Sequence, residues 1–600
     1  TRPFNALYTI DENMRAVSYF ADSAANGRNG LGTVHVVSAG NSRIIADYTS
    51  TNPLTNIRQS ISVAAGSNQG DIIIYSTAGP ANLVTAPVDV NLVLGPPAAL
   101  LPDSIFATTT VDIPGIDKGY TTTGFSGSLG PNFSYTSVFN GTSSAAPMVS
   151  GVVALMLEAN ANLGYRDVQD ILAISARQPW QTGSYELSEQ QTNGATNING
   201  GGFRYSTDYG FGFADAAAAV RLAESWQGQH TAANEIVFST GSFNLDTPIP
   251  ANADYPYQFE FSVDANFELE WVELDANLDH QFWGDLTLTL IAPSGTEHRL
   301  LDRIGKSPDF AYDLKAANLL GQTQVNWLED NGQFGIEAGA DGSTLNQPFA
   351  SAASRGESSQ GVWRFQINGE SIDQGGTGAS GILNSVELRL FGKEQSGSAG
   401  ADQTTFYFSD DYETLLSQEP ERFQAIQSAT PVAINVAASS QALVVNLQET
   451  QALLGTASIQ WDDSTIVNSI FGGDGTDLIT GSIRNETIYG GWNNDVIIYG
   501  GGQDIWSGGF GADQFQLNAN LLDPSLLRNG ANQIEFLDFS ANEDRLEIIN
   551  TGSSNALQLV SLDGNIAQLA FQTTDPALSG GVITLVNASG AWDPSYFQFA

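Results

Sequence analysis

Residues 139–157 read FNGTSSAAPMVSGVVALML, two adjacent serines followed by an apolar stretch. Val149, Val152, Val153 and Met156 recur at helical spacing, so the pattern predicts a helix that begins near the serines. A serine hydroxyl is a weak nucleophile alone and needs a neighbouring base and donors that hold the oxyanion. The question is therefore which serine could be a nucleophile, and which residues could activate it.

Helices and strands alternate around this stretch, from residue 1 to 228. Two further segments read as amphipathic helices and three as short buried strands: DENMRAVSYFADSAANG (11–27) and YRDVQDILAISAR (165–177), then TVHVVSAGN (33–41), QSISVAA (59–65) and NLVTAP (82–87). Such alternation predicts an α/β layer architecture.

The rest of the chain loses this helical periodicity. Between residues 229 and 395, strand-like stretches such as LTLTLIA (286–292) and VELRLFG (386–392) alternate with polar turns, which predicts an all-β sandwich or barrel. Residues 396–403 read as a polar linker, and residues 404–600 as a second β region. The chain is therefore predicted to contain several domains, as its 600 residues also suggest.

A nine-residue repeat runs from Gly472 to Gln516. Its units are GGDGTDLIT, GSIRNETIY, GGWNNDVII, YGGGQDIWS and GGFGADQFQ. The sixth position is always acidic: Asp477, Glu486, Asp495, Asp504 and Asp513. The eighth is always apolar: Ile479, Ile488, Ile497, Trp506 and Phe515. Acids eighteen residues apart are predicted to stack, and the apolar side chains to fill the space between two sheets.

This period is that of a calcium-binding repeat, in which glycines allow tight turns and carboxylates supply charged ligands. The glycines expected at the metal sites are Gly473, Gly475, Gly491, Gly500, Gly502, Gly509 and Gly511. The second unit lacks two of its glycines and places Arg484 beside Glu486, so its site is expected to be distorted or empty. The alternative is a glycine-rich array of turns without metal.

Composition limits the classes of partner. The chain has 65 acidic and 22 basic residues, a net charge of −43 that repels nucleic acid and anionic membranes and favours divalent cations. It has no cysteine, which excludes disulfides and a cysteine nucleophile. No stretch reads as a signal peptide or as the roughly 20 apolar residues of a membrane helix, so we expect no membrane insertion.

GTSSAAP and the helix after it resemble the serine region of subtilisin-like proteases of the kexin and furin branch, over nearly all of residues 7–225. The resemblance implies a mostly parallel α/β domain in which Ser143 is the nucleophile and Ser144 is a variable neighbour. VVSAGN (36–41) resembles the strand that ends in the side-chain oxyanion donor of this family, which implies that role for Asn41. Protein or peptide substrates are then implied.

The base and its carboxylate are not found where this family has them, before Asn41. The chain has four histidines: His35, His230, His280 and His298. His35 lies in a strand, and the other three follow the serine domain. We expect either a chain that lacks the first half of its catalytic domain or a degenerate pseudoprotease, and the start without methionine favours the first. Residues 1–600 alone are then expected to be inactive and to fold poorly over residues 1–228.

Two further resemblances concern the β regions. HQFWGDLTLTLIAPSGTEHRLL (280–301) and its surroundings resemble the P domain that follows the catalytic domain in kexin-like proteases. The nonapeptides resemble the RTX, or haemolysin-type, calcium-binding β-roll, and residues 404–600 as a whole resemble the C-terminal domain of serralysin-type metalloproteases.

Together these resemblances imply a secreted, calcium-dependent bacterial serine endopeptidase. Cleavage after basic residues is implied as well, with Asp47 as the substrate-binding candidate. The alternative is a calcium-binding structural or adhesive protein with an inert protease remnant.

Overall fold

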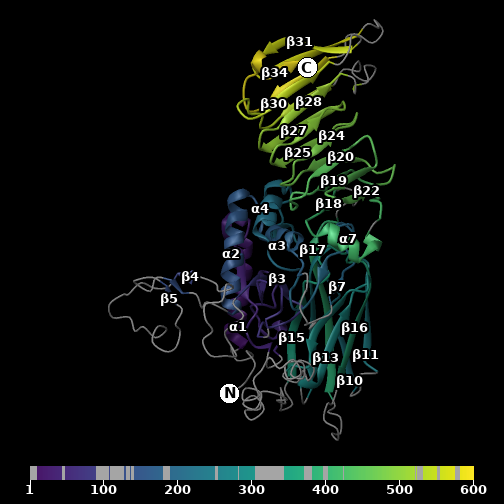
Figure 1. The fold of residues 1–600 in the computed structure, drawn as a ribbon. Helices are drawn as coiled ribbons and strands as arrows, with labels where there is room; N and C mark the ends of the chain where they lie inside the picture. The colour runs from purple at the N-terminus through teal and green to yellow at the C-terminus, as the bar shows by residue number, and fades with distance from the viewer. Residues whose placement is uncertain are drawn as a thin grey trace. The chain divides into compact units, whose positions relative to one another are not determined.

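The protein forms two compact units in the computed structural model shown in Figure 1. One contains Thr1–Ala195 and Gly202–Glu394, and the other contains Thr196–Gly201 and Gln395–Ala600. The structure describes residues 10–43, 47–73, 75–88, 107–108, 128–129, 135–136, 141–179, 190–250, 255–280, 283–304, 344–369, 381–395, 403–422, 424–519, 522, 532–550, 555–573 and 582–599. The predicted linker, 396–403, lies outside these ranges except for its last residue.

A parallel sheet forms the base of the α/β part of the first unit. Strands β1 (His35–Ser38), β2 (Ser60–Gly66) and β3 (Asn82–Pro87) pair in that order. Every residue of β2 is buried, as expected for a central parallel strand whose faces are both covered. Short strands complete this part: β4 (Ala107–Thr108), β5 (Ser128–Leu129), β6 (Tyr135–Thr136), β7 (Gln191–Thr192) and β8 (Arg204–Tyr205).

The helices of this part are α1 (Ile10–Asn26), α2 (Thr142–Ala159), α3 (Tyr165–Ser175) and α4 (Ala216–Ser225), with the 3-10 turns η1 (Gly27–Gly30) and η3 (Thr49–Thr51). Helix α2 packs on all three strands of the parallel sheet and on α4. Its other face leaves Met148 and Leu155 exposed, at 39% and 49%. Helix α2 is long and apolar enough to cross a membrane, with a mean hydropathy of 1.3. The core helix of a soluble protein can have the same length and hydropathy, so these two properties are weak evidence for a membrane span.

Two antiparallel sheets make up the remainder of the first unit. Their strands are β9 (Ile236–Ser239), β10 (Phe243–Ile249), β11 (Tyr257–Val263), β12 (Glu268–Asp279), β13 (Leu286–Ile291), β14 (Glu297–Asp302), β15 (Thr344–Ser351), β16 (Gly361–Gly369) and β17 (Gly381–Lys393), with the 3-10 turns η4 (Ala232–Asn234) and η5 (Trp283–Asp285). The strand order is β10-β17-β12-β15 in one sheet, where β9 also pairs with β17, and β11-β16-β13-β14 in the other. One hydrophobic core lies between the sheets, as in a β-sandwich.

Buried ion pairs join the sandwich to α3. Arg166 of α3 pairs with Glu270 at 2.6 Å, and Asp170 of α3 accepts from Lys393 at 2.6 Å and pairs with Arg355. Arg166, Asp170 and Arg355 are almost fully buried. Buried charges are tolerated when they are paired and hydrogen-bonded, so this contact fixes the sandwich against the α/β part.

The second unit stacks parallel strands in two sheets. Consecutive strands of the repeat region, β23 to β28, go alternately to one sheet and to the other. One sheet is ordered β18-β19-β23-β25-β27-β29-β33-β32-β31 and the other β22-β21-β20-β24-β26-β28-β30-β34. Antiparallel pairs occur only toward the ends, among β20, β21 and β22 and among β31, β32 and β33, within the described residues.

The elements of this unit have the following bounds: β18 (Thr404–Tyr407), α7 (Tyr412–Gln418), η6 (Pro420–Arg422), β19 (Val432–Asn435), β20 (Leu443–Asn446), β21 (Gln451–Leu454), β22 (Ala457–Gln460), β23 (Val467–Phe471), β24 (Leu478–Thr480), β25 (Thr487–Trp492), β26 (Val496–Ile498), β27 (Gln503–Phe510), β28 (Gln514–Asn518), β29 (Asn532–Phe536), β30 (Arg545–Ile549), β31 (Asn555–Asp563), β32 (Ile566–Thr573), β33 (Val582–Asn587), η7 (Pro594–Tyr596) and β34 (Phe597–Phe599).

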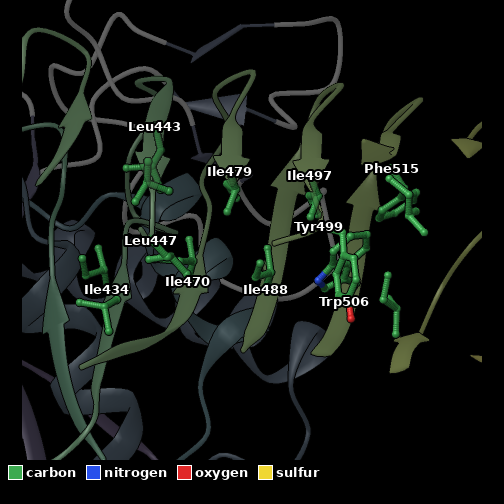
Figure 2. Packing of buried hydrophobic residues seen from close by; sticks show 14 of the residues in the cluster. Ile434, Leu443, Leu447, Ile470, Ile479, Ile488, Ile497, Tyr499, Trp506 and Phe515 are labelled. Carbon is green, nitrogen blue, oxygen red and sulfur yellow. The ribbon is translucent and has the colours of Figure 1, made fainter. Parts of the chain in front are cut away.

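The apolar eighth positions of the repeat form the core between these two sheets. Ile479, Ile488, Ile497, Trp506 and Phe515 are all fully buried. Figure 2 shows them in two facing rows, one from each sheet: Leu443, Ile479, Ile497 and Phe515 in one, and Ile434, Ile470, Ile488 and Trp506 in the other. This is the position that the nine-residue period predicts.

A short segment of the α/β sequence belongs to the second unit. The backbone N–H of Asn199 donates to the Tyr407 carbonyl at 2.8 Å, and Tyr407 donates to the Asn197 carbonyl at 2.9 Å. Ile198 thereby forms a parallel bridge with Tyr407. Residues 196–201 thus lie beside β18 through a single bridge, which the sequence does not predict.

Candidate functional site

The two adjacent serines at the start of α2 differ in exposure and bonding. Ser143 is exposed. Ser144 is only 1% exposed, and its Oγ donates to the Gly141 carbonyl at 2.9 Å. Gly141 caps the helix with φ 78°, a conformation that favours glycine. The Ser143 residue is therefore accessible from solvent, whereas the Ser144 hydroxyl is buried and hydrogen-bonded.

Asn41 lies against the same helix end. Its Oδ1 accepts from the backbone N–H of Thr142 at 2.9 Å and from Thr142 Oγ1 at 3.0 Å. A Cβ placed on Gly141 would come within 3.2 Å of Asn41 Nδ2. Because Oδ1 is held by Thr142, the Nδ2 donor is turned toward the turn that carries Ser143.

Two contacts that the sequence does not predict hold this arrangement. The backbone N–H of Gly141 donates to the Tyr75 hydroxyl at 3.0 Å, and the Gly40 N–H donates to Thr142 Oγ1 at 3.2 Å. Both connect the loop after β1 or β2 to the helix start. Tyr75 is separated from Gly141 by 66 residues, and no local pattern announces such a pairing.

A helix N-terminus has free N–H groups and the positive end of the helix dipole, so it can stabilise negative charge. Ser143 stands at this end of α2, close to the Asn41 amide. The arrangement can therefore offer a nucleophile and oxyanion donors from one small region. It is the chemistry of acyl transfer, provided a base is available.

None of the four histidines serves Ser143 as a base in the described structure. His35 Nε2 lies 2.6 Å from Ser23 Oγ, and the ring stacks on Phe20 with centroids 4.1 Å apart. His230 Nδ1 lies 2.6 Å from Asp167, and His298 lies between two serine hydroxyls in the sandwich. His280 is buried in the sandwich next to Gly369 and Gly381.

Asp47, the substrate-binding candidate, is buried, with 5% of its surface exposed. Its carboxylate accepts from the Tyr48 N–H at 2.9 Å and from Thr51 Oγ1 at 2.7 Å. Burial raises its pKa, partly offset by these two hydrogen bonds. These contacts hold a local turn, and no described contact joins Asp47 to Ser143 or Asn41.

The repeat carboxylates form a second candidate site, in two columns. The backbone N–H of Asp477 donates to Asp495 at 2.8 Å, and that of Asp495 to Asp513 at 2.9 Å. In the other column the backbone N–H of Glu486 donates to Asp504 Oδ1 at 3.0 Å. This is the stacking of acids eighteen residues apart that the spacing predicts.

Each column also holds buried oxygen atoms without a partner among the described residues. They are Glu486 Oε2 and the Oδ2 atoms of Asp495, Asp504 and Asp513. Glycine positions adjoin these atoms: a Cβ on Gly490 would lie 2.5 Å from Asp495 Oδ2 and 2.6 Å from the Gly508 carbonyl. Carboxylate and carbonyl oxygens around a space that excludes side chains are the ligands calcium prefers.

The predicted glycines differ in backbone conformation. Gly491, Gly502, Gly509 and Gly511 have positive φ, as the expected tight turns require. Gly473, Gly475 and Gly500 lack it but leave no room for a side chain, since a Cβ on each would come within 2.5 Å of a backbone oxygen or carbon. In the second nonapeptide of the repeat, residues 481–489, Glu486 accepts from Ser482 Oγ. No group of three His, Cys, Asp or Glu side chains forms a metal site in the described residues, so any ion would depend on backbone carbonyls.

The buried carboxylates resist ionisation. Burial, with Asp477 and Asp513 nearby, raises the pKa of Asp495 to about 8. Burial and the adjacent Glu486 raise the pKa of Asp504 to about 9. Repulsion of this kind is what a bound cation would relieve.

Two family models match the first unit. Residues 9–212 match the Subtilase family, and residues 269–390 match the proprotein convertase P-domain. The chain contains a subtilisin-like domain followed by a P domain. The first match supports a serine-type endopeptidase.

Curated relatives include endoproteases of the kexin and furin type. Endoprotease bli-4 of Caenorhabditis elegans is 25% identical over 62% of this chain and 33% of its own length. The Aeromonas extracellular serine protease of Aeromonas sobria is 29% identical over 44% of this chain and 42% of its own. Proprotein convertase subtilisin/kexin type 6 of Homo sapiens is 30% identical over 49% and 27%. The chain thus spans less than half the length of each of these relatives.

Among solved structures, the serine protease of Aeromonas sobria is similar over 65% of this chain and 69% of its own, with 20% identity and a TM-score of 0.47.

Proposed function

We propose that the protein is a serine endopeptidase of kexin type that hydrolyses protein or peptide substrates at Ser143. The observation that carries this proposal is the pair of an exposed Ser143 at the N-terminus of α2 and an Asn41 side chain fixed beside it by Thr142. The relatives, all of them partial matches, support the same reaction.

In the proposed reaction Ser143 Oγ attacks the scissile carbonyl carbon, and its proton passes to a base. The carbonyl oxygen becomes an oxyanion that the Ser143 N–H and Asn41 Nδ2 would hold. The oxyanion then collapses, the amine leaves with a proton, and water later releases the acyl group from Ser143. Ser144 takes no part, because its hydroxyl is bound to Gly141.

No histidine lies beside Ser143 in the described structure, because all four have other partners or lie in the sandwich. This favours a second candidate function, a calcium-binding structural or adhesive protein whose protease part is inert. The two differ in one property: only the first cleaves peptides when the whole native protein is assayed.

We further propose that the second unit is an RTX-type parallel β-roll that binds Ca²⁺. The unpartnered buried oxygens and adjoining glycine carbonyls support it, with Asp477, Glu486, Asp495, Asp504 and Asp513 as the acidic ligands. A calcium ion would compensate the negative charge of these buried carboxylates. A secreted, bacterial location belongs to this proposal, as does a preference for basic residues at the cleaved bond.

The test is peptide cleavage by the native protein as isolated from its host. Ser143→Ala is expected to abolish cleavage, and the matched control Ser144→Ala to retain it with reduced stability. Cleavage that survives Ser143→Ala would overturn the proposal. No cleavage by the native protein, with calcium uptake intact, would favour the inert alternative.

A further inference from the structure

The carboxylate column continues beyond the five recognisable repeats. Residues 539–547 read FSANEDRLE, with an acid at the sixth position, Asp544, and an apolar residue at the eighth, Leu546. Leu546 is fully buried in the same core as the repeat side chains. The segment lacks glycine and follows a longer connection, so its relation to the repeat is not evident from the sequence.

Asp544 occupies the place that the next repeat acid would take. The backbone N–H of Asp513 donates to Asp544 Oδ1 at 3.1 Å, as Asp495 donates to Asp513 Oδ1 at 2.9 Å. The strands agree, because β28 pairs with β30 in parallel with Gln514 opposite Arg545. Asp544 is therefore the fourth acid of the column, 31 residues after the third.

The Asp513 side of the space between these two acids has the features of the interior positions, whereas Asp544 Oδ2 accepts from the Ser540 N–H at 2.7 Å. Asp513 is only 1% exposed, and its Oδ2 has no hydrogen-bond partner among the described residues. This atom points at Gly508, where a Cβ would lie only 2.2 Å away. An unpartnered carboxylate oxygen facing a glycine is the arrangement seen at Asp495 and Gly490.

A further acid borders the same turn. Asp538 accepts from the N–H groups of Gly508 at 3.0 Å and Gly509 at 2.9 Å, and from Ser507 Oγ. It thus lies at the backbone of the turn that Asp513 Oδ2 faces. The one basic side chain nearby in the strand, Arg545, is half exposed and pairs with Glu547 at 3.1 Å.

We propose that a further divalent-cation site lies at the end of the column, bracketed by Asp513 and Asp544 with Asp538 beside it. Backbone carbonyls would complete its ligands, since the three carboxylates alone do not form a metal site in the described residues. The ligand class is a hard cation that takes oxygen ligands, calcium in the first place. The inference rests on the proposed calcium binding of the repeats and adds one ion to those expected between the repeat acids. It makes Asp538 and Asp544, which lie outside the repeat, part of the metal site.

The test is calorimetric titration of calcium into the full chain after chelation. Asp544→Asn keeps an oxygen that can accept the Asp513 N–H but removes the charge, and Asp538→Asn does the same beside Gly508. Each variant is expected to bind one ion fewer than the wild type, or to bind the last ion at least tenfold more weakly. The exposed Asp563 of β31 provides a matched control, since Asp563→Asn is expected to leave binding unchanged.

The outcomes are distinguishable. If both variants bind as many ions as the wild type with the same affinities, the end site is wrong while calcium binding by the repeats stands. If the wild type binds no calcium, the proposed calcium function fails and the end site with it. Hydrogen exchange at the Leu546 amide reports whether Asp544→Asn still folds; if it does not, Asp538→Asn alone decides.

Discussion

One peptide bond separates Ser143 from Ser144, yet the fold treats them differently. The helix start directs one hydroxyl outward and ties the other to the Gly141 carbonyl. The order Gly-Thr-Ser in the sequence indicates the exposed serine, because the motif and the helix are both local. The fixation of Asn41 by Thr142, 101 residues away, depends on the assembled sheet and is not visible in any local pattern.

Asn41→Asp should separate the two functions of the Asn41 side chain. The variant keeps an oxygen for Thr142 but loses the Nδ2 donor, so the native enzyme should lose about 10²- to 10³-fold in kcat at little cost in stability. Steady-state kinetics with a peptide substrate, alongside thermal unfolding, measure both. An unchanged kcat would remove Asn41 from the oxyanion site.

His298 predicts a pH dependence of the sandwich. Complete burial between Ser351 and Ser354 lowers its pKa to about 3, from an ordinary value near 6.5. The unfolded chain takes up a proton below pH 6.5 that the folded chain refuses. Stability is therefore fully present above pH 6.5 and falls by about 1.4 kcal/mol per pH unit below it.

This dependence can be measured as the free energy of opening of β16 amides by hydrogen exchange at pH 7 and pH 5. His298→Gln should be less stable at pH 7 but should lack the additional loss at pH 5. Equal losses in the wild type and the variant would show that His298 is not the responsible group.

At the scale of elements, local periodicity predicts much and sequence-distant pairing little. The strand predicted at 82–87 is β3 (Asn82–Pro87), and the repeat places its strands because each unit carries its own turn and core residue. The sequence does not predict the end of the column, because glycine, the main signal of the repeat, is absent there. The pairing of Arg355 with Asp170 spans 185 residues and could not be predicted either.

Arg355→Met should destabilise the first unit strongly. It leaves the buried Asp170 with Lys393 as its only remaining ion-pair partner in the described structure, and breaking a buried pair costs about 3–5 kcal/mol. The control is Arg364→Met, whose exposed pair with Glu260 is worth about 0–1 kcal/mol. Denaturant unfolding followed by hydrogen exchange of α3 amides measures both. Similar losses in the two variants would contradict the proposed role of the buried pair.

At the scale of the whole chain, residues 196–201 belong to the second unit, so neither unit is one continuous stretch of sequence. They are flanked on both sides by residues of the first unit but pair with β18 of the second. No sequence pattern predicts that these residues belong to the second unit, because a segment of six residues is too short to show a periodicity. The stability of the segment should therefore follow the second unit.

Ile434→Ala tests this dependence. Ile434 is fully buried in β19, and its truncation should cost about 2–5 kcal/mol in the second unit. Hydrogen exchange at the Asn199 amide should accelerate together with that at Tyr407, whereas the Phe213 amide, bonded to Arg177 in the first unit, should not change. If Asn199 behaves like Phe213, the segment belongs to the first unit.

Ser143 is the nucleophile in the proposed serine endopeptidase. Covalent labelling of the native protein with a fluorophosphonate, followed by mass mapping of the modified peptide, tests it most directly. We expect a single label on Ser143, lost in Ser143→Ala and retained in Ser144→Ala. A label on another residue, or a native protein that cleaves peptides without labelling at Ser143, would contradict it.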